Sequence, residues 1–245
     1  LRWPLSPFTS VGLVLFVVSF FNILYGTLVG ISKFEVKDIE FHHSNLPKAF
    51  DGYRIVQLSD IHIGSWIDNE KPINGLVELV NAQKPDLIVF TGDLVNQRSC
   101  ELEGFQDILA QLHAKDGVYS ILGNHDYGSY YHWKNLKEQV NNIDNLVRMQ
   151  KAMGWKLLNN EYDILHHEGD SIALIGVEND GEPPFSQFAD LKKATKGTDG
   201  MFRILLSHNP THWRREVLPD TDIELMLAGH THAMQAIMFG HSLAS

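Results

Sequence analysis

Four short polar blocks, each placed where an apolar run ends, constrain the fold of this chain more than any other feature. Each preceding run is short and apolar, as in a buried strand. The blocks offer carboxylate, imidazole and amide groups from separated points of the chain, and Ser207-His208 adds a fifth point. They are Asp60-Ile61-His62, Gly92-Asp93, Gly123-Asn124-His125-Asp126 and Gly229-His230-Thr231-His232. Such a set of side chains is typical of a hydrolase that uses two metal ions.

Length and charge narrow the class of protein. The chain has 245 residues, of which 44% are hydrophobic and 20% charged, so we expect one globular domain after the N-terminal segment. The formal net charge of −10 argues against a nucleic-acid partner, because phosphate backbones attract clustered Lys and Arg. Cys100 is the only cysteine, which excludes an internal disulfide. It lies outside the polar blocks, so we do not expect it to be a nucleophile.

The N-terminal segment is different in kind. No charged residue lies between Arg2 and Lys33, and residues 8–31 are mostly Val, Leu, Phe and Ile. Crossing a bilayer takes about 20 apolar residues, so this run predicts a transmembrane helix and a location at the cell membrane. A cleaved signal peptide is the alternative, but its apolar core is usually about 7 to 15 residues long. Basic residues flank both ends, so the side of the membrane is undetermined.

We divide the chain into three parts. Residues 1–33 form the membrane anchor, residues 34–52 a linker with a first strand, and residues 53–245 the catalytic domain. The strand is predicted because apolar and charged residues alternate over residues 34–41. Since the first residue is Leu1, we expect that further membrane segments can precede it. Since the chain stops soon after His232, we expect the last sheet to be incomplete.

Strands and helices alternate through the first half of the domain, which favours a central sheet covered by helices. Ligands are then expected at the carboxyl ends of the strands. The later half is less regular, with one long helix, a hairpin, a short helix and two more strands. The predicted strands cover residues 53–58, 86–90, 118–122, 162–165, 171–177, 203–206 and 223–227, and the predicted helices residues 69–83, 102–113, 133–153 and 185–193.

The spacing within the blocks predicts how metals are held. Asp60 and His62 are two residues apart, as are His230 and His232, so in an extended chain each pair faces one way. Carboxylates combined with imidazoles suit Mn, Zn, Fe or Ni better than Ca or Mg. Asp93 is a single carboxylate that could bridge two cations about 3.5 to 4 Å apart.

These motifs resemble those of the calcineurin-like metallophosphoesterases, and of their membrane-anchored bacterial members in particular. That signature reads D-x-H, G-D, G-N-H-[DE], a lone H and then G-H-x-H, in this order. The matches here run from about Tyr53 to the end of the chain. The resemblance implies an α/β fold arranged as a four-layer α/β/β/α sandwich. One departure is that Ala233-Met234 precede Gln235, where such members often carry two glycines.

The resemblance also implies roles for individual residues. One metal would be held by Asp60, His62, Asp93 and His232. The other would be held by Asp93, Asn124, His208 and His230, with Asp93 bridging. A hydroxide between the metals would attack phosphorus while His125 faces the leaving group as a general acid, or stabilises the phosphoryl oxygens. Asp126 would orient or charge His125.

Residues outside the blocks receive a plainer interpretation. The histidines outside the blocks are expected to be solvated, with His42-His43 and His166-His167 in surface turns, although His212 shares a loop with His208. A group of aromatic residues follows the first and third blocks, and packing is the commoner role for such residues than walling a cleft. The group comprises Trp66, Tyr127, Tyr130, Tyr131 and Trp133.

We therefore expect an enzyme that hydrolyses a phosphoester with two transition-metal ions. Confinement to a bilayer makes a lipid-linked or nucleotide-lipid phosphodiester a natural substrate. A phosphomonoesterase, including a protein phosphatase, is the alternative within the same chemistry. Two non-enzymatic alternatives are a metal-binding scaffold and a membrane receptor whose metal only organises structure. Retention of His125, which neither metal requires, favours catalysis.

Overall fold

The computed structural model describes residues 6–183, 185–231, 237–238 and 241–242. It divides into two compact units, residues 1–41 and residues 42–245, and each is described by itself.

The first unit is dominated by helix α1, Pro7–Leu28, which is followed by a 3₁₀ turn at Gly30–Ser32. The helix begins where Ser6 accepts a hydrogen bond from the backbone N–H of Thr9, and Pro7 occupies its first turn. Its length of 22 residues corresponds to about 33 Å. The stretch Pro7–Ser32 has a mean hydropathy of 2.1 and no buried residue, so its length and composition allow it to cross a membrane, although a signal sequence passes the same test.

The strand predicted over residues 34–41 is not formed. These residues belong to neither of the four-stranded sheets, and the first strand of the domain begins at Ile55. Alternation of apolar and polar residues produces a strand only where a sheet edge is at hand to pair with it. Phe34, Val36, Ile39 and Phe41 are instead exposed.

The second unit begins with a parallel sheet of order β1-β2-β3-β4. Its strands are β1 (Ile55–Leu58), β2 (Leu87–Phe90), β3 (Val118–Ser120) and β4 (Lys156–Leu157), and the helices between them are α2 (Lys71–Ala82), α3 (Gln106–Leu109) and α4 (Leu136–Ala152). The register pairs Leu58 with Phe90, Phe90 with Ser120 and Ser120 with Leu157. The carboxyl ends of these strands therefore lie at one edge of the sheet, where the polar blocks begin.

A second sheet has the order β5-β6-β7-β8. Its strands are β5 (Glu161–His167), β6 (Asp170–Gly176), β7 (Phe202–Leu206) and β8 (Leu225–Leu227), with the short helices α5 (Leu191–Ala194) and α6 (Leu218–Asp220). The first two strands form the predicted hairpin, and Glu168 and Gly169 both have positive φ, as a two-residue type I′ turn requires. His166 and His167 pair within β5, so their prediction as turn residues was wrong. A separate small ladder joins β9 (Ile237–Met238) and β10 (His241–Ser242).

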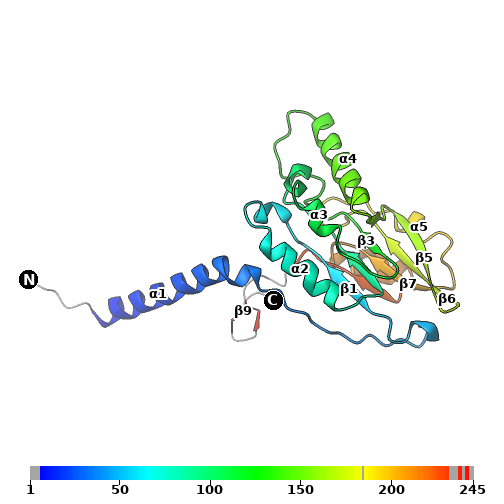
Figure 1. Cartoon of the computed structure of the whole chain (residues 1–245), viewed down its shortest axis with the longest axis horizontal. Helices are drawn as coiled ribbons and strands as arrows, with labels where there is room; N and C mark the ends of the chain where they lie inside the picture. The colour runs from blue at the N-terminus through cyan, green and yellow to red at the C-terminus, as the bar shows by residue number, and fades with distance from the viewer. Residues whose placement is uncertain (1–5, 184, 232–236, 239–240, 243–245) are drawn as a thin grey trace, which may run out of the picture. The chain divides into compact units, whose positions relative to one another are not determined.

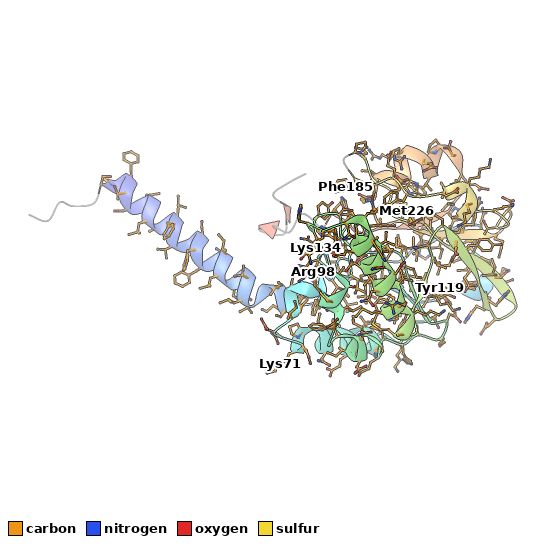
Figure 2. The ribbon with its side chains drawn as sticks, turned by 90° about the horizontal axis from the view of Figure 1, so that it is seen from above. Lys71, Arg98, Tyr119, Lys134, Phe185 and Met226 are labelled. Carbon is orange, nitrogen blue, oxygen red and sulfur yellow. The ribbon has the colours of Figure 1, made fainter. Side chains whose placement is uncertain are left out.

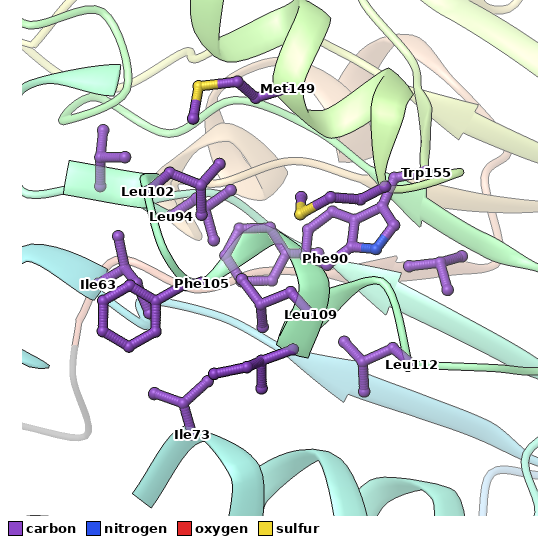
Figure 3. Packing of buried hydrophobic residues seen from close by; sticks show 14 of the residues in the cluster. Ile63, Ile73, Phe90, Leu94, Leu102, Phe105, Leu109, Leu112, Met149 and Trp155 are labelled. Carbon is purple, nitrogen blue, oxygen red and sulfur yellow. The ribbon is translucent and has the colours of Figure 1, made fainter. Parts of the chain in front are cut away.

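Alternating side chains on the strands divide the interior into three cores. Figure 1 shows the strands and helices of this unit between which the cores lie. Ile88 and Phe90 of β2 pack against α2, α3 and α4, and Figure 3 shows Phe90 between Leu109 and Trp155 in that core. Leu87 and Val89 of the same strand face the second sheet. The outer face of the second sheet packs against α5 and the region before α6. Four layers result, so the predicted α/β/β/α sandwich is confirmed.

Candidate metal centre

Four of the candidate ligands have a left-handed backbone. Asp60, His62, Asp93 and His230 have φ of 54°, 46°, 60° and 70°. This conformation costs a residue with a side chain roughly 1 to 2 kcal/mol, and it is retained where the surrounding structure fixes it. The N–H of Asp60 donates to the carbonyl of Gly92 at 3.0 Å, and that of His62 to Asp93 at 3.1 Å. The prediction that an extended strand aligns Asp60 with His62 was therefore wrong, because β1 ends at Leu58 and both residues have a left-handed backbone.

The two sheets bring His208, Asn124 and His230 together. Nε2 of His208 lies 3.0 Å from Oδ1 of Asn124, and Nδ1 of His230 lies 2.9 Å from the same oxygen. The two imidazole nitrogens are 3.3 Å apart. The backbone N–H of His230 also donates to the carboxylate of Asp60, at 3.0 and 3.2 Å. Residues up to 170 positions apart thus meet at one point.

Asp93 lies between two groups of candidate ligands. Its Oδ2 is 3.2 Å from Nε2 of His208 and 3.7 Å from Nε2 of His62. The other oxygen, Oδ1, accepts the backbone N–H of His125 at 2.8 Å. One group joins His62, Asp93 and His125, and the other joins Asp93, His208 and His230, with the ligand atoms of each within 4.8 Å of one another. Asp93 is shared by both groups.

The hydrogen bonds around His208 fit a bound cation. Its Nδ1 lies 2.8 Å from the carbonyl oxygen of Thr91, which can only accept, so Nδ1 carries the proton of a neutral ring. Nε2 then presents a lone pair to oxygens of Asp93 and Asn124. A metal ion among these three donors satisfies them together, and a ligating histidine ordinarily donates its second N–H to such a carbonyl.

Without a metal, the same atoms attract each other as an ion pair. Burial opposes the charge on Asp93, but the hydrogen bond and charge of His208 lower the pKa of this carboxyl below its usual range. Burial likewise lowers the pKa of His208, and the Asp93 carboxylate outweighs it, so that pKa is raised. Both pKa shifts arise because the buried Asp93 carboxylate is stabilised by a positive charge nearby.

Asp126 does not have the predicted contact with the His125 ring. Its fully buried carboxylate accepts the backbone N–H groups of Asp93, Leu94, Val95 and Gly123 at 2.8 to 3.1 Å. Burial, followed by the Asp93 charge, raises the pKa of Asp126 to about 7, while these donors act in the opposite direction. The sequence placed Asp126 beside His125, but neighbouring residues of a turn point in different directions. Asp126 joins the second and third blocks instead.

The ring of His125 is held by residues that motif analysis did not single out for that purpose. Its Nδ1 lies 2.7 Å from the carbonyl oxygen of Asn96, which makes Nδ1 the donor. Its ring packs against those of His62 and Tyr130, each with a centroid distance of 4.7 Å. The hydroxyl of Tyr130 also accepts from Nδ2 of Asn124 at 2.9 Å, which directs the amide oxygen toward His208 and His230. The role of the Asn96 carbonyl could not be predicted from the sequence, because every residue has a backbone carbonyl. Tyr130 could be noticed, because it is an aromatic residue close to the third block.

The glycines of the second and third blocks are required by close backbone contact. A Cβ on Gly92 would lie 2.6 Å from the nitrogen of Gly123 and 2.7 Å from Nδ1 of His208. Gly92 also has a φ of 98°, which favours glycine. These two glycines allow the loops that carry Asp93 and Asn124 to touch.

The structure brings together all but one of the predicted ligands. His232 and the Ala233-Met234 departure lie outside the described residues. His212, expected to be solvated, is instead completely buried, with Nδ1 2.9 Å from Oγ of Ser207 and Nε2 2.9 Å from Oε2 of Glu216. It supports the residue before His208 rather than joining the metal centre.

Comparison with known proteins identifies the family. The family model described as calcineurin-like phosphoesterase matches residues 53–234, and the chain belongs to this family. A Danio rerio protein described as a transmembrane protein with metallophosphoesterase domain is 30% identical over 86% of this chain and 47% of its own length. The UDP-2,3-diacylglucosamine pyrophosphatase LpxG of Chlamydia trachomatis is 28% identical over 78% of this chain and 68% of its own. A phosphopantetheinyl hydrolase structure from Mycobacterium tuberculosis matches with a TM-score of 0.43, at 15% identity, over 73% of this chain and 83% of that one.

The family confirms the predicted class of enzyme, a metallophosphoesterase that uses divalent metal ions. The chain spans about half the length of the first curated relatives it matches, at 47% and 45%.

Proposed function

We propose that this chain hydrolyses a phosphoester bond with two metal ions held by the candidate metal centre. The observation that carries this proposal is the position of Asp93, whose buried carboxylate is shared by two groups of ligand atoms. A carboxylate in this position can neutralise and space two cations. Asn124 adds an uncharged oxygen, so it can ligate without reducing the Lewis acidity of an ion.

The proposed division of ligands is centred on Asp93, which both groups share, and it assigns His125 of the first group to the substrate rather than to an ion. Asp60, His62, Asp93 and His232 hold one ion, and Asp93, Asn124, His208 and His230 hold the other. When bound, the ions polarise a phosphoryl oxygen and lower the pKa of water. Imidazole and carboxylate donors suit Mn, Zn, Fe or Ni.

His125 is the proposed proton donor to the leaving group. Its Nδ1 is occupied by the Asn96 carbonyl, so Nε2 is the atom that exchanges a proton with substrate. The Tyr130 ring beside it limits its rotation. Asp126 is then a positioning residue that fixes the backbone between Asp93 and Val95.

A lipid-linked phosphodiester or diphosphate is the proposed substrate. The chlamydial relative is described as a pyrophosphatase of a diacylated nucleotide sugar, and α1 can hold the chain at a membrane. A large aromatic side chain is also exposed at the metal centre. Tyr130 is 51% exposed and contacts His125 and Asn124, and the ring of the next residue, Tyr131, is 41% exposed. Such side chains can contact the apolar part of an amphiphile.

The proposed arrangement of the whole chain is an anchor over residues 1–33, a linker over 34–52 and a catalytic domain from residue 53, located at the cell membrane. The substrate then reaches the site from the bilayer surface. No nucleic-acid partner is proposed.

The test is turnover by the full chain in detergent on a nitrophenyl phosphate monoester and on bis(p-nitrophenyl) phosphate. Mn, Zn, Fe and Ni are added in turn, and chelated protein and Asp93→Asn serve as controls. We expect turnover with at least one metal and its loss in both controls, and the preferred ester decides between a diesterase and a monoesterase. Stoichiometric metal without any turnover would favour a non-catalytic scaffold.

A further inference from the structure

A cleft of about 300 Å³ is lined by residues close in sequence to those that contact the metal centre, and none of the candidate ligands is among them. It is formed by the loop after β2, the loop before α4 and the first turns of α4. The lining residues are Arg98, Ser99, Cys100, Tyr131, His132, Trp133, Lys134, Glu138 and Asn142. This volume is at the lower end of the range for small-ligand sites.

Both walls of the cleft continue directly from residues that contact the metal centre. Arg98 is two residues after Asn96, whose carbonyl holds the His125 ring. Tyr131 follows Tyr130, whose hydroxyl holds the Asn124 amide. Because consecutive Cα atoms are about 3.8 Å apart, each wall begins within about 8 Å of a residue that positions the centre.

The cleft has two cationic side chains, Arg98 and Lys134, in its lining, although the chain as a whole has a formal net charge of −10. Arg98 and Lys134 lie together in Figure 2, and Glu138 is the carboxylate among the lining residues. In the described structure, the ammonium of Lys134 makes no ion pair. Nε of Arg98 approaches Glu101 at 4.0 Å, while that carboxylate is engaged by backbone N–H groups of residues 96–98.

The ring of Tyr131 contacts the Arg98 guanidinium. Its Cζ lies 5.1 Å from the centroid of the Tyr131 ring, within the range of a cation–π contact. The Tyr131 ring packs against Trp133 at a centroid distance of 4.7 Å, and Nε1 of Trp133 donates to the carbonyl of Gly128 at 2.7 Å. A guanidinium held in this way loses little freedom when it binds an anion.

We propose that the cleft is a subsite for an anionic group, a phosphate or carboxylate, carried by the substrate next to the scissile phosphoester. Arg98 and Lys134 bind this group, and Tyr131 and Trp133 contact the portion of the substrate that carries it. The subsite selects diphosphate diesters over simple diesters. This inference rests on the proposed function, because it assigns a second binding site for the same substrate.

The kinetic test uses the full chain in detergent with two substrates. Bis(p-nitrophenyl) phosphate has no second anionic group, whereas UDP-glucose is a diphosphate diester. In Arg98→Gln/Lys134→Gln we expect KM for UDP-glucose to rise about tenfold or more with kcat unchanged, and KM for bis(p-nitrophenyl) phosphate to change less than about twofold. Lys137→Gln is the matched control, since Lys137 is an exposed α4 residue outside the cleft. Equal KM changes for both substrates, or an equal effect of Lys137→Gln, would overturn the subsite.

A binding test separates the subsite from the proposed reaction. Cys100 is exposed, lines the cleft and is the only cysteine of the chain, so its alkylation by neutral iodoacetamide reports on the cleft alone. With chelated protein, UDP-glucose should slow this alkylation at least about threefold in the wild type and not in the double variant. Inorganic phosphate and micellar phosphatidic acid serve as further probes, and stronger protection by phosphatidic acid would identify a lipid as the source of the anion. Protection without turnover on any ester would refute the hydrolase and keep the subsite, and turnover without protection by any probe would refute the subsite.

Discussion

The carboxylate of Asp126 accepts the backbone N–H of Asp93 at 2.8 Å, so a residue of the third block fixes the main chain at the shared ligand of the metal centre. The same carboxylate accepts three further backbone N–H groups. The left-handed backbone of Asp93 is therefore maintained by a side chain 33 residues later in the chain. The G-D and G-N-H-D blocks act as one structural unit.

Replacement of Asp126 by Ala should lower the free energy of unfolding by about 3 kcal/mol, because buried N–H groups are left without acceptors. Chemical denaturation of chelated protein measures this loss without a contribution from metal binding. Asp68→Ala, at an exposed position, is the control and should change the unfolding free energy by less than about 0.5 kcal/mol. Unchanged stability in Asp126→Ala, together with weaker metal binding, would show that its charge matters rather than its hydrogen bonds.

Replacement of His125 by Ala should lower kcat about 10² to 10⁴-fold, the usual contribution of a general acid. Metal content should remain near that of the wild type, because neither proposed ligand set includes His125. Metal analysis and steady-state kinetics on the same preparation check both expectations. Full activity with full metal content would remove His125 from the catalytic role.

Gly92→Ala tests whether close contact between the loops is needed. The new Cβ would lie against Gly123 and His208, so we expect reduced metal affinity and a loss of stability well above the cost of the left-handed backbone, about 1 to 2 kcal/mol. Gly117→Ala is the matched control, since Gly117 has a φ of 94° and open space around its Cα. If the two variants lose equal stability and bind metal equally well, the contact is unimportant.

The sequence predicts interactions made by side chains better than interactions made by backbone atoms. The four layers and the gathering of candidate ligands around Asp93 were predictable, because side-chain identity and the order of apolar runs determine them. The carbonyls of Asn96 and Thr91 were not, since every residue has one. The left-handed backbone of Asp60 was also hidden, because it is fixed by hydrogen bonds from distant loops rather than by glycine. The strand expected over residues 34–41 is not formed. Strand pairing, like the backbone of Asp60, depends on residues far away in the chain, which local alternation does not reveal.

His208 and His212 provide a contrast within one loop, since both side chains are fully buried. His208→Ala should abolish stoichiometric metal binding. His212→Gln should retain the metal, because His212 contacts Ser207 and Glu216 instead of the candidate ligands. Metal analysis of the two variants distinguishes a ligand from a supporting residue, and loss of metal from both would make the whole loop, rather than His208, the determinant.

The pH dependence of stability gives an independent test of the buried His212. Burial lowers the pKa of His212 in the folded chain, and the Glu216 carboxylate opposes this only in part. The unfolded chain, with a histidine pKa of about 6.5, therefore binds a proton first as the pH falls. Stability should decrease below about pH 6.5 and continue to decrease until the folded pKa is reached.

Urea unfolding of chelated protein between pH 7.5 and 5.5 should show a smaller decrease in His212→Gln than in the wild type. Parallel pH profiles would mean that the pKa of His212 is the same in the folded and unfolded chains, and a smaller decrease in the wild type would mean that Glu216 keeps His212 protonated in the folded chain.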